Sequence, residues 1–399
     1  MVIVLSTKKG QYWINRLLFA FLFATAFLSP PLIFQHLQLV DDAVRISLSF
    51  CAILLCILSH PKLRRSDILV FSCALFLLVV EVIWDRSRMS NILSFYAVII
   101  LSLLLFYVLK NSKSCREIIL ASWIRIAYIL SITAIALSLL HNFTSLDTDF
   151  FQFSRNNVAL YNYRYSFLGV TQNKNIFDFD VTRAYSYFVE AQYAGFYFTI
   201  NVMIAIALNR KFKHRVWMVL NLLAGMLTFS TTFFISMAML LSLKFRSKII
   251  YFSLLAAIII SFGSLFVKYT SYDERVLRLV IAIELLSRSS PSELLLGHGV
   301  ESPTADTSDI ADVGVNAGVL ILLVERGILG LLFSMTVMTL LMNKNYLNLS
   351  VCWIWLLALN WNINYIYWIG LLVLWVVSRK ESLRSESLGI KRLTPALIT

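Results

Sequence analysis

The residues best suited to chemistry lie in a polar stretch in the second half of the chain. Arg275, Arg278 and Arg288 are followed by a Gly-His-Gly turn at 297–299. An arginine guanidinium is a planar fork that can bind two phosphate oxygens at once. Several arginines beside such a turn therefore predict a clamp for a phosphate or pyrophosphate group. Each arginine alone could equally meet an anionic lipid, and His298 could contact phosphate or sugar or simply pack within its own turn.

A second polar stretch, 141–187, combines many Phe and Tyr residues with the basic residues Arg155, Arg164, Lys174 and Arg183. Aromatic faces beside hydrogen-bonding groups suit sugar rings, whose C–H faces stack on them and whose hydroxyls need partners. The alternative is that these aromatic residues form a small core of their own, or a belt at the membrane interface.

Long apolar runs must position these two stretches. The chain is 59% hydrophobic and 14% charged, whereas soluble domains average about 45–50% and about 25%. Runs of roughly 15–20 apolar residues cross the hydrocarbon core as helices, because backbone groups in lipid must be bonded internally. We expect such runs at 17–34, 43–58, 68–84, 92–109, 118–140, 188–208, 216–229, 233–243, 249–267, 327–342, 349–359 and 365–377.

Three of these expectations have alternatives. Residues 216–243 could form one long helix or a hairpin of two, and the last two runs are short. Residues 316–325 could form a re-entrant or interfacial helix that leads into the next span. Glu325 and Arg326 could pair with each other where that helix enters the membrane.

Charge predicts the orientation of the spans. The net charge of +13 would suggest a nucleic-acid partner in a soluble protein, but here the basic clusters lie between apolar runs. The positive-inside rule is the better interpretation, and we expect no nucleic-acid partner. All clusters share the cytoplasmic side only if 216–243 is a hairpin. We therefore predict an all-α transmembrane bundle of about twelve spans, one domain over 1–399, with long outward loops at 141–187 and 268–315.

Several short motifs, taken in order, resemble the O-antigen polymerase and O-antigen ligase superfamily. The C-terminal signature of that family is an arginine, a Gly-x-Gly turn and a helix ending in a motif like Glu-x-Gly-Ile-Leu-Gly, and Arg278, 294–299 and 323–330 are similar to it. Residues 183–195 resemble the family's entry into a span, and 227–232 resemble its Leu-Thr-x-Ser-Arg turn. The resemblance covers roughly 183–330, while the first 140 residues match only in hydropathy.

The chain also departs from the family pattern. Asn316 stands where the ligases carry a histidine, which favours a polymerase over a ligase. Thr231 replaces the arginine of the Ser-Arg turn, and Ala191 replaces the proline that usually follows the glutamate at Glu190. The Arg-x10-Gly pattern of the polymerases is met by Arg288 and Gly299.

The resemblance implies glycosyl transfer at the periplasmic face of a bacterial inner membrane, by a multi-pass protein. The donor would be a chain on undecaprenyl pyrophosphate, and the acceptor a hydroxyl of one lipid-linked repeat unit. Pyrophosphate leaves, so the reaction needs cations where negative charge develops, and no metal or cofactor is expected. Further partners would be the lipid bilayer and a chain-length regulator protein. The implied catalytic residues are Glu190 as base, Arg278 and Asn316, with Arg183, Arg275, Arg288, His298 and Arg164 binding substrate.

Three other functions remain open. An O-antigen ligase would share the motifs. A membrane glycosyltransferase that uses a polyprenyl-phosphate sugar could place acids in its first outer loop, where Asp41 and Asp42 lie. A flippase or other secondary transporter would have a similar number of spans, but it should show paired halves and charges within the membrane.

Overall fold

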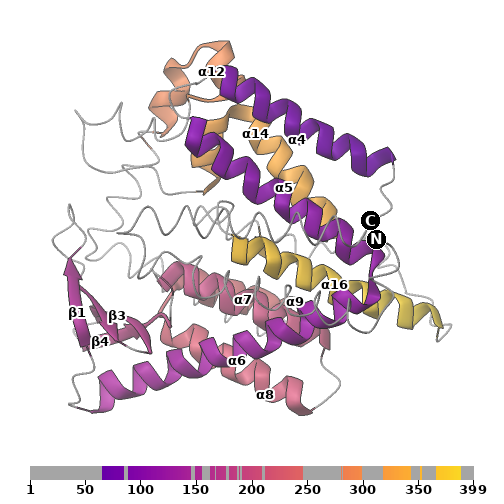
Figure 1. The fold of residues 1–399 in the computed structure, drawn as a ribbon. Coiled ribbons are helices and arrows are strands. Elements are labelled where there is room, and N and C mark those ends of the chain that lie inside the picture. Colours follow the sequence, from indigo (N-terminus) through magenta and orange to yellow (C-terminus); the bar gives the residue numbers. More distant parts are fainter. Residues whose placement is uncertain are drawn as a thin grey trace.

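The computed structural model describes residues 65–84, 89–144, 149–154, 162–166, 168–176, 179–186, 188, 191–208, 212–245, 280, 282–298, 318–342, 351–352 and 365–387. Most of these residues are helical (Figure 1). The helices are α4 (Arg65–Trp84), α5 (Met89–Asn111), α6 (Lys113–Phe143), α7 (Ala191–Leu208), α8 (Phe212–Leu227), α9 (Thr231–Phe245), α12 (Pro291–Leu296), α14 (Gly318–Met342) and α16 (Tyr365–Ser387).

The helices indicate a membrane protein. Among the described residues, three segments are long and apolar enough to cross a bilayer: α6, α7 and Leu322–Leu340 of α14. Shorter apolar helices occupy Ile68–Trp84, Phe95–Asn111, Arg215–Leu227 and Tyr367–Arg379. Their outward faces are apolar too, as expected where lipid replaces water. On α4, for example, the exposed large residues are Ile68, Leu69, Leu75, Phe76, Val79, Ile83 and Trp84.

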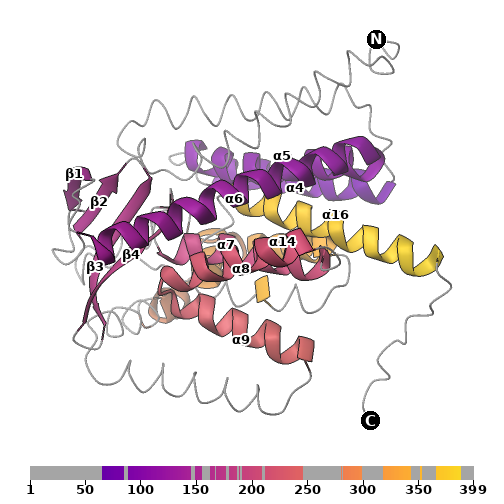
Figure 2. The ribbon, with the colours of Figure 1, turned by 90° about the horizontal axis from the view of Figure 1, so that it is seen from below.

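Helix α16 joins two groups of helices. One group contains α4, α5, α12 and α14, and the other contains α6, α7, α8 and α9 (Figures 1 and 2). α16 packs against α5 and α14 of the first group and against α6 and α7 of the second. Its residues from Tyr367 to Val377 are buried. The short apolar run 365–377 therefore forms the centre of the described bundle.

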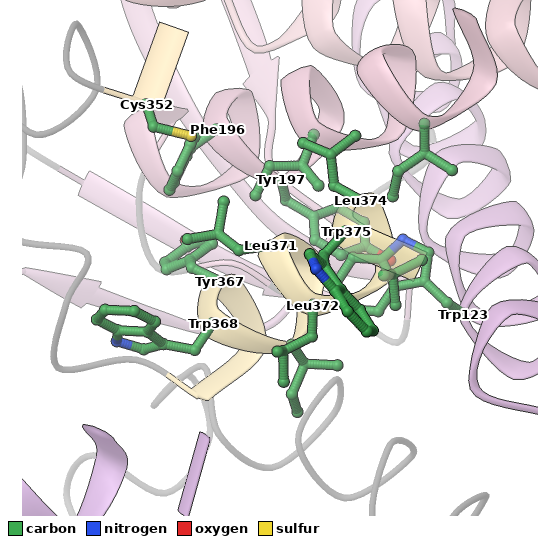
Figure 3. Close-up of a cluster of buried hydrophobic side chains, with 14 of the residues drawn as sticks. Trp123, Phe196, Tyr197, Cys352, Tyr367, Trp368, Leu371, Leu372, Leu374 and Trp375 are labelled. Carbon is green, nitrogen blue, oxygen red and sulfur yellow. The ribbon is translucent and has the colours of Figure 1, made fainter. Parts of the chain in front are cut away.

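The core around α16 is rich in aromatic rings (Figure 3). Tyr367 stacks on Tyr193 of α7 with ring centroids 6.0 Å apart, and its hydroxyl donates to the Tyr193 carbonyl oxygen at 3.0 Å. Trp375 meets Phe106 of α5 edge to face at 4.9 Å. Such pairs add roughly 0.5–1.5 kcal/mol beyond the area they bury, so they fix how α16 sits between its neighbours.

A chain of buried hydrogen bonds joins α6, α7 and α8. The indole Nε1 of Trp123 donates to Asn201 Oδ1 at 2.7 Å, and Asn201 Nδ2 donates to Asn221 Oδ1 at 2.8 Å. Asn221 Nδ2 donates in turn to the Trp217 carbonyl oxygen at 2.8 Å. Because a buried polar group without a partner is costly, these bonds hold the three helices in one arrangement.

The region 216–243 contains two helices rather than one long helix. α8 ends at Leu227 and α9 begins at Thr231, with Thr228 and Phe229 in a turn between them. Phe229 has a positive φ of 48°, which interrupts the helix. The hairpin alternative is therefore confirmed. The expected spans 17–34, 43–58 and 249–267 lie outside the described residues, as does 349–359 apart from 351–352.

The stretch 141–187 contains a sheet, which the all-α prediction did not include. β1 (Asp149–Ser154), β2 (Asn162–Ser166), β3 (Gly169–Ile176) and β4 (Phe179–Ala184) form an antiparallel sheet in the order β1-β2-β3-β4. Phe151 lies opposite Tyr165 and Phe153 opposite Tyr163. Aromatic residues favour strands, and cross-strand aromatic pairs stabilise them. The aromatic residues that suggested sugar binding therefore also explain why this segment is a sheet.

The sheet is tied to one end of α6, and basic residues gather at the other. Asn142 Nδ2 donates to the Thr182 carbonyl oxygen at 2.9 Å, and the Thr182 N–H donates to Asn142 Oδ1 at 3.0 Å. At the opposite end, about 40 Å away along α6, Arg116 donates to the Leu109 carbonyl oxygen at 2.6 Å. Arg379 of α16 donates to the Lys110 carbonyl oxygen at 3.4 Å. The basic cluster of Lys110, Arg116 and Arg379 and the sheet thus lie at opposite ends of α6 (Figures 1 and 2).

Candidate functional site

Two glycines bring the Gly-His turn against α14. Gly297 and Gly327 have φ values of 85° and 62°, and a Cβ on Gly297 would overlap the Glu325 carbonyl group. A Cβ on Gly327 would overlap the Leu295 carbonyl group. Only glycine fits where the backbones approach this closely with positive φ. We call this contact of 295–298 with 324–327 the α12–α14 joint.

The joint is also held by hydrogen bonds. The backbone N–H of His298 donates to the Val324 carbonyl oxygen at 2.8 Å, and Trp84 Nε1 donates to the Gly297 carbonyl oxygen at 3.3 Å. Gly327 interrupts the helical backbone of α14, with φ 62° and ψ −170°. Helix α14 therefore consists of two helical segments, 318–326 and 328–342, which meet at a kink.

His298 contacts two side chains at the joint. Its Nε2 lies 2.6 Å from Ser289 Oγ, and its Nδ1 lies 3.9 Å from Glu293 Oε1. Glu293 also forms a capping box at the start of α12, where its Oε2 accepts from the Ser290 N–H at 2.7 Å and from the Ser290 hydroxyl at 2.8 Å. The hydrogen bond from the Ser290 backbone N–H holds the pKa of the Glu293 carboxyl below its usual value. A carboxylate is therefore fixed beside an imidazole.

A buried ion pair lies next to the joint. Arg326 of α14 pairs with Glu81 of α4, and both side chains are almost fully buried. The Tyr96 hydroxyl of α5 donates to Glu81 Oε1 at 2.6 Å, and the Arg326 guanidinium lies 4.6 Å from the centre of the Phe95 ring. Glu81 is not among the site residues predicted from the sequence, although an ionisable residue inside an apolar run is itself a signal of a site.

Arg183 holds the turn between α8 and α9. Its Nε donates to the Thr228 carbonyl oxygen at 2.8 Å, and its Nη2 donates to the Phe229 carbonyl oxygen at 3.1 Å. The guanidinium is buried and lies 5.6 Å from the centre of the Tyr185 ring. The structure thus brings together two of the motifs, 183–195 and 227–232. At least two of the Arg183 donors bind protein backbone rather than standing open for a phosphate.

The structure describes only some of the other predicted site residues. Arg288 is exposed and pairs with Glu284 one helical turn earlier. Arg164 lies in β2, opposite Gln152 of β1 and Thr171 of β3. Glu190, Arg275, Arg278 and Asn316 lie outside the described residues. Within the described residues, no three His, Cys, Asp or Glu side chains gather as a metal site would require.

Comparison with protein-family models and with curated proteins finds no match for this chain. The similarity of its motifs to the polymerase and ligase superfamily therefore stays a prediction. What the structure adds is the placement of the motif residues: Arg183 contacts the 228–229 turn, and Gly297 contacts the 325–327 segment.

We predict that Arg183→Lys destabilises the protein. A lysine has one ammonium group and cannot reach both carbonyl oxygens, which should cost about 1–3 kcal/mol. Thermal unfolding of the detergent-solubilised protein measures this. Arg125→Lys, on an exposed position of α6, is the matched control and should unfold like the wild type. Wild-type unfolding of Arg183→Lys would contradict the structural role.

We also predict strong coupling between Glu81 and Arg326. Glu81→Gln or Arg326→Met alone leaves a buried charge without its partner, which should cost about 3–5 kcal/mol, whereas the double variant should lose much less than the sum. The exposed pair Glu284 and Arg288 provides the control, because neutralising it should cost less than about 1 kcal/mol. Additive losses at Glu81 and Arg326, measured by the same thermal unfolding, would argue against the pair.

Proposed function

We propose that this protein is a polymerase of surface polysaccharide, which joins undecaprenyl-pyrophosphate-linked repeat units at the periplasmic face of the bacterial inner membrane. The observation that carries the proposal is the pairing of motifs far apart in the sequence. Arg183 bonds to the turn at 228–229, and the 295–298 turn packs on 324–327. These contacts join the same sequence motifs whose order along the chain resembles the polymerase and ligase superfamily.

The arrangement of the helices supports the orientation in this proposal. α5 starts beside the α12–α14 joint, because Trp84 at the end of α4 bonds to Gly297. It ends next to Lys110 and Arg116, where α6 begins. The joint and the sheet therefore share one end of the bundle, and this basic cluster lies at the other (Figure 1). The positive-inside rule assigns the basic end to the cytoplasm.

The outward end offers groups that suit lipid-linked sugars. The sheet carries aromatic residues on neighbouring strands, including Tyr163 and Tyr165 of β2. The polar stretch before the joint carries Arg275, Arg278 and Arg288 in the sequence. Cations there would stabilise the negative charge that develops on the departing pyrophosphate. The transfer itself needs no metal, and a chain-length regulator protein would be a natural partner at this face.

The orientation can be tested with reporter fusions. Alkaline phosphatase, which folds only in the periplasm, should be active when fused between β1 and β2 at 155–161 and inactive when fused at Phe212, the start of α8. A fluorescent protein that matures only in the cytoplasm should give the reverse pattern at the same two positions. Phosphatase activity at Phe212 would overturn the proposed sidedness.

The function can be tested by deleting the gene. Without a polymerase, surface lipid should carry a single repeat unit and no longer chains, because transfer of one unit needs no extension. Without a ligase or a flippase, surface lipid should carry no repeat unit at all. Glycan ladders on gels distinguish these outcomes, and complementation by the intact gene controls for effects on neighbouring genes. Surface lipid wholly without repeat units would reject the proposal.

A further inference from the structure

We propose that His298 is the general base of this transfer, with Glu293 as the residue that orients it. The inference rests on the proposed function and adds to it the group that removes the acceptor proton. The resemblance implies that role for Glu190, which lies outside the described residues, and implies only a contact with substrate for His298. The geometry of the α12–α14 joint supports His298 as the base.

The Nε2 atom of His298 already faces a hydroxyl group. Ser289 Oγ lies 2.6 Å from it, within the distance over which a base accepts a proton. The single proton of this hydroxyl has two acceptors within reach, His298 Nε2 and the Leu285 carbonyl oxygen at 2.7 Å. Because Ser289 has this second partner, it can turn away from Nε2 and keep a hydrogen bond. The position of its oxygen then marks where the acceptor hydroxyl would sit.

Glu293 orients the imidazole from the other side. Its Oε2 is held by the Ser290 N–H and hydroxyl, which leaves Oε1 directed at Nδ1 at 3.9 Å. This separation is longer than a hydrogen bond, as is common at catalytic pairs before substrate binds. A base oriented by a third group is the general pattern for activating a hydroxyl. The depressed pKa of the Glu293 carboxyl keeps it charged, so that it can stabilise the imidazolium that forms.

The joint fixes where His298 can act. The backbone N–H of His298 is bonded to Val324, and Gly297 leaves no room for a side chain. The His298 side chain is only 15% exposed, so most of the ring is enclosed by the joint. Other charged groups on the elements around the joint are Glu284, Arg288, Glu325, Arg326 and Glu81.

The proposed step replaces one bond at the anomeric carbon of the donor and moves one proton from the acceptor. The hydroxyl of the acceptor sugar gives its proton to His298 Nε2, while its oxygen forms a bond to the anomeric carbon of the donor chain. The bond between that carbon and the pyrophosphate oxygen breaks, and undecaprenyl pyrophosphate leaves with the electron pair. The imidazolium then releases its proton to water at the outer face.

The test uses purified full-length protein in proteoliposomes. The substrate is the lipid-linked repeat unit extracted from the deletion strain, and the readout is chain length on gels. His298→Gln should lower the extension rate by about 10²–10⁴-fold, because a glutamine amide cannot accept the proton of the acceptor hydroxyl. His141→Gln, the same change at the sheet end of α6, should extend chains like the wild type.

Two further variants separate catalysis from folding. His298→Ala should be inactive and should regain activity when free imidazole is added, because a small base can enter the space left by the ring. Glu293→Gln keeps a residue that suits the capping box, so it should lower kcat by about tenfold with KM unchanged, as expected for an interaction made in the transition state.

The outcomes are distinguishable. Wild-type rates for His298→Gln would overturn the assignment of the base while leaving the polymerase proposal intact. A raised KM with kcat unchanged, or no rescue of His298→Ala by imidazole, would also overturn it, because His298 would then bind substrate or support the fold. Failure of the wild-type protein to extend any chain would overturn the proposed function itself, and the inference with it.

Discussion

The close approach of two backbones at Gly297 and Gly327 is the constraint on which the candidate site depends. Neither position has room for a Cβ, and both residues have positive φ. This contact interrupts α14 and places His298 beside α12. It also sets Arg326, the residue before the interruption, where it meets Glu81 of α4. One local backbone geometry therefore determines the positions of an imidazole and a buried guanidinium.

Three sets of interior polar groups in the described bundle lie where another element supplies a hydrogen-bond partner. Arg326 meets Glu81, Arg183 meets the carbonyl oxygens of the α8–α9 turn, and Asn201 bridges Trp123 and Asn221. A charge in a medium of low polarity is tolerated only when paired and hydrogen-bonded. These partners therefore select one packing of helices whose apolar surfaces alone would allow several.

Several features could be predicted from the sequence because they depend on local chemistry. The apolar runs at 68–84, 92–109, 118–140 and 188–208 coincide with α4, α5, α6 and α7 to within a few residues, since a helix is the local solution for backbone in lipid. The hairpin at 216–243 followed from the requirement that basic clusters share one side. The sheet was missed because its aromatic and polar residues were interpreted by their chemistry rather than by their strand propensity.

The sequence by itself therefore determined that this is a helical membrane protein, where most described helices lie, and which residue types gather in its polar segments. Only the tertiary structure decided which of those residues meet. Nothing local indicates that Arg183 binds the carbonyl oxygens of residues 228 and 229, or that Arg326 pairs with Glu81, 245 positions away in the chain. Such partners are chosen by how the helices pack, because hydropathy fixes only that a segment is buried and not which segment lies beside it.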